Sequence, residues 1–167
     1  MAGLIGFPVL SRRISLRRKA LARSAVRPEE ARSEMEVREG MSSVVLAVGP
    51  DHTLRQAAAK MTEKGTGAAL VFDDESPGPR IITERDVLNA IGNGDDPDKA
   101  TVADHMSDSV ISAPPDWSLE RAAEEMVKLG IRHLVVVDQG ELVGVLSMRD
   151  IVRVWTRVGA TSSINPP

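Results

Sequence analysis

Two short segments place a hydroxyl residue three positions before an aspartate: Thr83 with Asp86, and Ser147 with Asp150. If each segment opens a helix, the carboxylate can accept hydrogen bonds from the vicinal diol of a ribose. The hydroxyl, the helix N-terminus and the arginine that precedes each aspartate can then hold phosphate oxygens. The same spacing is typical of a capping box, in which the acid satisfies a backbone N–H at the start of a helix. The two equivalent copies favour a ligand site, but the capping role stays open.

Both segments lie within two copies of one longer unit. Placing Met41 over Met106, an offset of 65 residues, gives 11 identities in the 32 residues from Met41 to Phe72. Unrelated segments rarely match so well without gaps, and the matches fall on apolar and turn positions that a fold would need. The chain therefore contains an internal duplication.

Each copy predicts the order strand, helix, strand, strand, helix. Apolar residues at 54, 57, 58 and 61, and again at 119, 122, 123 and 126, follow the spacing of one helix face. Thr53 with Gln56 and, in the second copy, Ser118 are suited to cap these helices, and Gly65 and Gly130 are suited to end them. The predicted strands are residues 44–48, 68–72 and 80–83 in the first copy, and 110–112, 133–137 and 142–146 in the second.

This pattern resembles the CBS domain, the module named after cystathionine beta-synthase, of which a pair is called a Bateman module. The resemblance covers about residues 37–156. The family signature, a small residue, two hydrophobic residues, Ser or Thr, two further residues and Asp, is matched by Gly144–Asp150. The first copy, Arg80–Asp86, has arginine where the family usually has glycine. A second family element, Gly-Ile-Arg-His-Leu at Gly130–Leu134, has lost its basic pair in the first copy, at residues 65–69.

The resemblance implies an α/β (α+β) fold of two tandem βαββα-type repeats packed about a pseudo-twofold axis. We expect an N-terminal extension at 1–34, repeats at 35–92 and 101–157, a linker at 93–100 and a tail at 158–167. The family binds adenine nucleotides or S-adenosylmethionine in clefts between the repeats. The residues expected in the first cleft are Thr83, Arg85 and Asp86 opposite Val110, Ile111, Arg132 and His133. Those expected in the second are Ser147, Arg149 and Asp150 opposite Val44, Val45 and the neutral pair Gly67 and Ala68.

The sequence thus favours a stand-alone regulatory module that binds AMP, ADP, ATP or S-adenosylmethionine and transmits a change of shape to a regulated partner. No Gly-x-Ser-x-Gly elbow or nucleophile with a base is visible, so we expect no catalytic residues and no required cofactor. The alternative is a pair without nucleotide, which acts in dimerisation or protein interaction. Apolar stripes on the last helix of each repeat predict a homodimer; they are Val87, Leu88 and Ile91, and Ile151, Val152 and Trp155. Trp155 either anchors the interface or covers the core of its own repeat.

Composition argues against several other classes. The absence of cysteine excludes disulfides and thiolate zinc sites. Two Phe, two Trp and no Tyr leave few aromatic faces on which nucleic-acid bases could stack. The apolar runs are far shorter than the roughly 20 residues of a membrane-spanning helix. We therefore expect no nucleic-acid partner, no membrane, no metal site and a cytoplasmic location.

The first 28 residues differ in charge from the rest of the chain. They hold six Arg, one Lys and no acid, which leaves a net charge of −10 on the remaining 139. This composition is typical of an organellar targeting peptide, a basic arm or a disordered extension. A true start of the protein at Met35 or Met41 is a further alternative.

Overall fold

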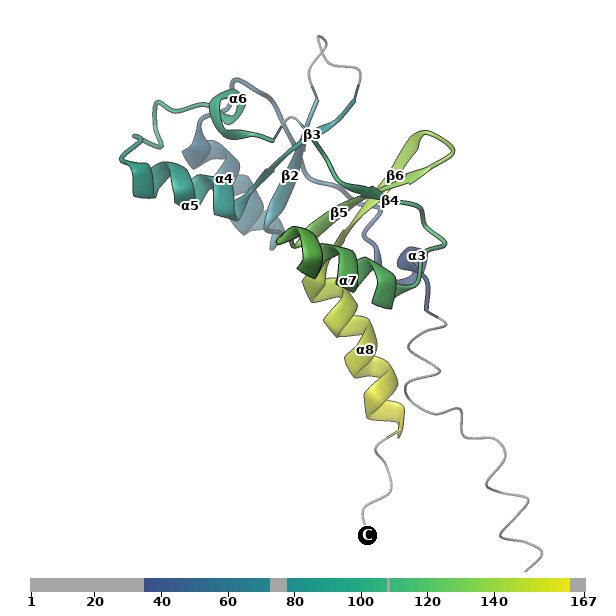
Figure 1. Cartoon of the computed structure of the whole chain (residues 1–167). Helices are drawn as coiled ribbons and strands as arrows, with labels where there is room; N and C mark the ends of the chain where they lie inside the picture. Colours follow the sequence, from purple (N-terminus) through teal and green to yellow (C-terminus); the bar gives the residue numbers. More distant parts are fainter. Residues whose placement is uncertain (1–34, 73–77, 108, 163–167) are drawn as a thin grey trace, which may run out of the picture.

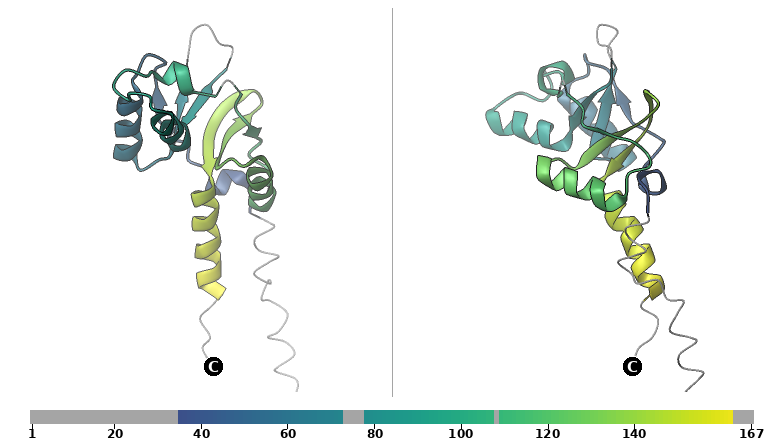
Figure 2. Two further views of the ribbon diagram at one scale, coloured as in Figure 1. Left: turned by 60° about the vertical axis from the view of Figure 1, so that its left-hand side comes forward. Right: turned by 45° about the vertical axis from the view of Figure 1, so that its right-hand side comes forward.

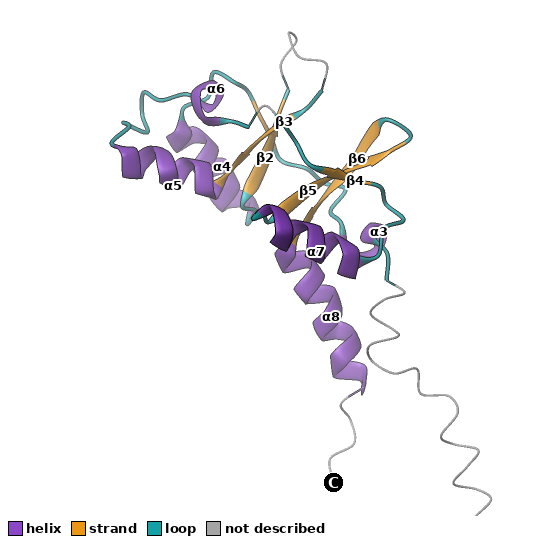
Figure 3. Cartoon of the chain, viewed as in Figure 1, coloured by secondary structure: helices purple, strands orange, loops and turns teal. Residues whose placement is uncertain are grey.

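The computed structural model describes residues 35–72, 78–107 and 109–162, and side chains only to residue 157. It is a mixed α/β structure of two repeats, each with a three-stranded sheet and helices (Figure 1). Viewed by secondary structure, α4, α5 and α7 line one side of the molecule and the strands lie beside them (Figure 3). The α/β fold with two repeats is therefore confirmed.

The first repeat contains β1 (Ala47–Val48), α4 (Leu54–Lys64), β2 (Ala68–Val71), β3 (Arg80–Thr83) and α5 (Glu84–Asn93). In its sheet, β1 runs parallel to β2, and β2 runs antiparallel to β3 with Ala68 opposite Thr83. Thr53 caps α4 through a capping box with Gln56, as expected. Gly65 ends this helix with a φ of 63°, a left-handed conformation that glycine adopts without strain.

The second repeat repeats this plan with β4 (Ser112–Ala113), α7 (Leu119–Leu129), β5 (His133–Asp138), β6 (Glu141–Ser147) and α8 (Met148–Ser162). Ser118 accepts a hydrogen bond from the Arg121 amide and so caps α7, as expected. β5 lies between β4 and β6, parallel to the first and antiparallel to the second. Helix α8 extends past α7 and away from both sheets (Figure 2).

Each core is completed by a short segment from the start of the other repeat. Helix α3 (Val37–Gly40) packs on the second repeat, where Val37 is fully buried with Leu119 and Leu146. Helix α6 (Val102–His105) packs on the first repeat, where Val102 is fully buried. Backbone hydrogen bonds hold both exchanged segments in place. They join Ser42 to Val145, and the Ser107 amide to the Ile81 carbonyl. The two repeats are thus interlocked.

This exchange corrects two predicted strands. Residues 44–48 and 110–112 were expected to lead their sheets, but β1 begins only at Ala47 and β4 only at Ser112. Ser42 is held at the edge of the second sheet, so residues 43–46 span from one sheet to the other before pairing begins. The same reasoning applies to residues 109–111, since Ser107 is held at the first sheet. Val44, Val45, Val110 and Ile111 therefore lie in crossing segments.

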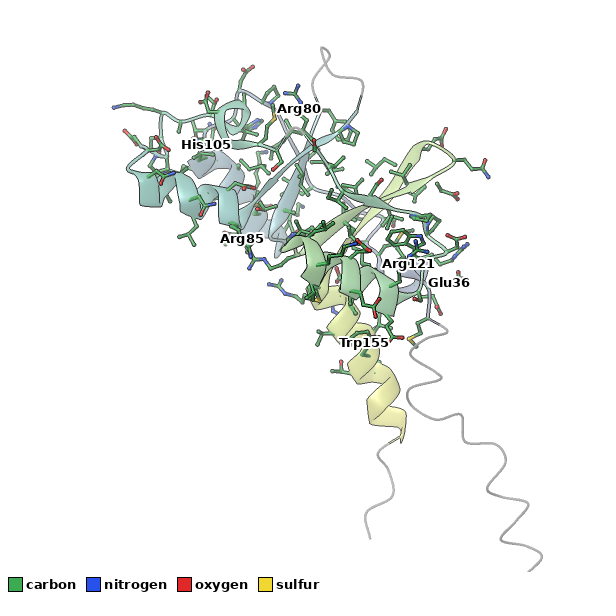
Figure 4. All side chains as sticks on the ribbon, viewed as in Figure 1. Glu36, Arg80, Arg85, His105, Arg121 and Trp155 are labelled. Carbon is green, nitrogen blue, oxygen red and sulfur yellow. The ribbon has the colours of Figure 1, made fainter. Side chains whose placement is uncertain are left out.

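The apolar stripes on α5 and α8 divide between core and surface. Val87 and Ile151 are buried, whereas Leu88 is 67% exposed and Ile91 and Val152 are half exposed. Trp155 packs against the core of the second repeat, beneath α7 in Figure 4. In the described part of the chain, no helix is long and apolar enough to cross a membrane.

Candidate functional site

A cavity of about 610 Å³ lies between the two repeats. Its walls come from the segment that enters β1, the end of α4, the start of β2 and the first turn of α5. The second repeat contributes the start of β5, the end of β6 and the first turns of α8. Among the residues predicted for a site, those that line it are Val44, Val45, Arg132, His133, Ser147, Arg149 and Asp150. Gly67 and Ala68 line it as well, so the structure brings together the residues expected in the second cleft.

The signature of the second repeat forms one edge of this cavity. Asp150 accepts hydrogen bonds from the backbone N–H of Ser147 at 3.1 Å and from its hydroxyl. The other carboxylate oxygen of Asp150 accepts from Arg153 at 2.6 Å. The carboxylate therefore caps α8 while it also faces the cavity, and the two roles considered from the sequence are compatible in one geometry.

The signature of the first repeat has the same capping geometry at another place. Asp86 accepts from the backbone N–H and the hydroxyl of Thr83, both at 2.7 Å. Thr83, Arg85, Asp86, Val110 and Ile111 do not line the 610 Å³ cavity. Their assignment to a ligand remains a prediction.

Arg132 and His133 were expected to face Thr83 and Asp86, and this grouping is corrected by the structure. His133 pairs with Ser147 across the β5–β6 ladder. Because paired residues of neighbouring strands lie side by side, Arg132 and His133 reach the cavity that contains Ser147.

Two arginines of the signatures link the repeats in a symmetric way. Arg85 donates to the carbonyl of Gly130 at 2.7 Å, and Arg149 donates to the carbonyl of Gly65 at 3.2 Å. Each guanidinium group thus contacts the C-terminal end of a helix in the other repeat, where the helix dipole favours a positive charge. Figure 4 shows Arg85 reaching from α5 toward α7. Both arginines, predicted as phosphate ligands, hold a backbone carbonyl in the free protein.

Three charged residues of the cavity were missed from the sequence: Glu84, Lys64 and Arg153. Glu84 forms an ion pair with Arg132 across the repeats at 3.0 Å. Its position directly after Thr83, at the first turn of a predicted helix, was a signal that could have placed it near the site. The lining carries four cationic side chains and two carboxylates, so the cavity favours an anionic ligand. No cluster of metal-ligating side chains occurs within the described residues.

The pKa of His133 is lowered below its ordinary value of 6.5. The main cause is burial, which disfavours the charged imidazolium. The charges of Arg132 and Arg149 also lower it, while Glu84 and Asp150 act in the opposite direction. His133 is therefore neutral at neutral pH and can accept a hydrogen bond from a ligand.

This lowered pKa predicts a loss of stability in acid. As the pH falls below about 6.5, the unfolded chain binds a proton at His133 that the folded chain does not bind. The free energy of unfolding of the wild type should therefore fall more steeply between about pH 7 and pH 5 than that of His133→Gln. Urea unfolding at several pH values measures both slopes, and parallel slopes would contradict the prediction.

The comparison with known families agrees with this geometry. Residues 34–93 and 102–157 match the CBS domain family. The chain belongs to this family. The two CBS domains correspond to the two repeats of the structure, and the cavity lies between them.

Individual relatives match the same region of the chain. An uncharacterised protein of Methanopyrus kandleri is 36% identical over 119 residues, which make up 70% of this chain and 61% of that protein. The CBS domain-containing protein YhcV of Bacillus subtilis is 33% identical over 116 residues, 69% of this chain and 81% of that protein. The solved structure of a CBS domain protein from Pyrobaculum aerophilum, complexed with AMP, is 29% identical in sequence and superposes with a TM-score of 0.62. The match covers 74% of this chain and 99% of that chain. The chain therefore spans less than two thirds of the Methanopyrus relative.

Proposed function

We propose that this CBS pair is a regulatory module that binds one adenine nucleotide per chain in the 610 Å³ cavity. The observation that carries the proposal is the meeting of Asp150, a carboxylate suited to a ribose diol, with four cationic side chains in one cavity. The apolar side chains of Val44 and Val45 supply a wall for a flat base. The AMP complex of the Pyrobaculum relative supports the choice of ligand class.

The charge of the cavity distinguishes among the ligands considered. AMP, ADP and ATP carry phosphates that cationic side chains attract. S-adenosylmethionine carries a net positive charge, because its sulfonium and ammonium groups outweigh its one carboxylate. Lys64, Arg132, Arg149 and Arg153 would therefore attract it less than a phosphate-bearing nucleotide. We therefore favour a phosphate-bearing nucleotide. The module has no reaction of its own in this proposal, and ligand binding acts on a regulated partner by shifting the equilibrium between two conformations.

A thermal-shift measurement tests the proposal. A ligand that binds only the folded state at ten times its Kd adds about 1.4 kcal/mol to the free energy of unfolding. AMP should therefore raise the Tm by a few degrees at saturating concentration. No shift with AMP, ADP or ATP would contradict a nucleotide site and favour the alternative, a pair that acts in protein interaction alone.

We further propose that the module is a homodimer. Leu88 on α5, Val127 on α7 and Val152 on α8 expose half or more of their surface, although each is apolar. Light scattering should give twice the chain mass for the wild type and the monomer mass for Leu88→Glu. Lys60→Glu, on the exposed face of α4, is the control and should remain a dimer. A wild-type monomer would contradict the proposal.

A further inference from the structure

The ion pair between Glu84 and Arg132 has no counterpart at the pseudo-symmetric positions. Glu84 is the first residue of α5, and the equivalent first residue of α8 is Met148. Arg132 precedes β5, and the equivalent residue before β2 is Gly67. Backbone hydrogen bonds confirm the equivalence, because Glu84 N donates to Gly67 O and Met148 N donates to Arg132 O, both at 2.9 Å. An acidic residue of the first repeat therefore pairs with a basic residue of the second, and the equivalent positions with the repeats exchanged, Met148 and Gly67, form no such pair.

Gly67 is what lets the carboxylate lie there. A Cβ atom added to Gly67 would come within 2.8 Å of a carboxylate oxygen of Glu84 and within 2.9 Å of its carboxyl carbon. The φ of Gly67 is not in the left-handed region, so the backbone itself does not demand glycine here. The space above Gly67 is filled by the acid that reaches Arg132.

The other arginines of the cavity also hold acceptors of the chain itself. Arg153 donates to Asp150 at 2.6 Å, and Arg149 donates to the Gly65 carbonyl at 3.2 Å. A phosphate group that binds an arginine in this cavity therefore meets a guanidinium that already holds an acceptor of the chain. Of these acceptors, only Glu84 is both charged and in a different repeat from the arginine that it contacts. Its carboxylate would also repel each further phosphate charge that enters.

We propose that Glu84 determines the specificity of the cavity and favours a nucleoside monophosphate over a nucleoside triphosphate. It does so by holding Arg132 and by repelling added phosphate charge. This inference rests on the proposed function, because it requires a nucleotide in the cavity. A phosphate bound to Arg132 competes with Glu84 for the guanidinium charge and repels the Glu84 carboxylate, and so weakens a contact between the two repeats. Ligand binding and the contact between repeats are coupled through one residue.

The test compares the wild type, Glu84→Gln and the control Glu63→Gln. Glu63 lies exposed on α4 outside the cavity lining, so its replacement removes the same charge without touching the site. Isothermal titration measures the Kd of adenosine, AMP and ATP for each protein. Both side chains of the ion pair are about half exposed, so solvent weakens the effect and we expect AMP to bind Glu84→Gln about threefold more tightly than wild type. The gain should be larger for ATP and absent for adenosine.

A second measurement needs no ligand. Arg132 contacts Glu84 through Nη2, so the Arg132 Nη protons should exchange with water more slowly in the free wild type and in Glu63→Gln than in Glu84→Gln, as measured by NMR. Equal exchange in all three proteins would overturn the ion pair and with it the role of Glu84. Slow exchange together with unchanged nucleotide affinities in Glu84→Gln would overturn the selectivity alone. Failure of all three proteins to bind any of the nucleotides would overturn the proposed function, and the selectivity with it.

Discussion

Replacing Asp150 with alanine is expected to weaken AMP binding and so to reduce the thermal stabilisation by AMP, whereas Asp86→Ala is expected to retain it. Each aspartate caps a helix through the same pair of hydrogen bonds, so each variant should lose a similar stability of about 1 kcal/mol. Only Asp150 lines the cavity. Loss of a charged hydrogen-bond partner from a ligand weakens binding by roughly tenfold or more.

The matched pair makes the result easy to interpret. Thermal shift and isothermal titration on the two variants separate loss of a cap, which both share, from loss of the ligand contact. Unchanged AMP binding in Asp150→Ala would show that this carboxylate only caps α8. Loss of binding in Asp86→Ala alone would show that the nucleotide binds at the signature of the first repeat.

The substitution Gly144→Ala is expected to destabilise the fold by about 2 kcal/mol because the added Cβ atom would clash with a backbone carbonyl. A Cβ atom at this position would lie 2.6 Å from the carbonyl oxygen of Ser42, which belongs to the crossing segment of the first repeat. Two backbone hydrogen bonds join Ser42 to Val145 at this point, at 2.9 and 3.0 Å. The Cβ position is fixed by its own backbone and the carbonyl oxygen belongs to another backbone segment, so a side-chain rotation cannot relieve the clash.

A control for this variant lies at Gly92, near the end of α5. A Cβ atom there meets nothing within 4 Å, and alanine favours a helix over glycine by roughly 0.5–1 kcal/mol. Gly92→Ala should therefore be neutral or stabilising in urea unfolding. If Gly144→Ala unfolds at the same urea concentration as the wild type, the crossing segment is more adaptable than the structure indicates.

Local signals in the sequence predicted the local structure well. The capping residues Thr53 and Ser118 and the terminating glycine Gly65 act as expected, because a cap depends on a few neighbouring residues. The strand at residues 80–83 has the predicted bounds, and the helix pattern at 54–61 follows a buried face. The resemblance to the CBS family supplied the pairing of the repeats, which no local pattern contains.

What the sequence did not predict depends on contacts between distant segments. Nothing near Val37 indicates that it packs on residues more than 80 positions away, so the leading strands were drawn too long. The cleft of Arg132 and His133 was misassigned because pseudo-symmetry alone does not say that His133 pairs with Ser147. Glu84 was missed because its role depends on an arginine of the other repeat.

The exchange of α3 and α6 has a consequence for how the chain can be divided. A cut in the connection between α5 and α6 would give two fragments, and each would carry the piece that closes the core of the other. Neither fragment could bury its apolar residues alone, but a mixture of the two could reassemble by mutual completion. Had the repeats been two identical separate chains, the same arrangement would be a swapped dimer with twofold symmetry. Covalent connection of the repeats makes their assembly independent of protein concentration, and it lets one copy keep a neutral Gly67 while the other carries Arg132.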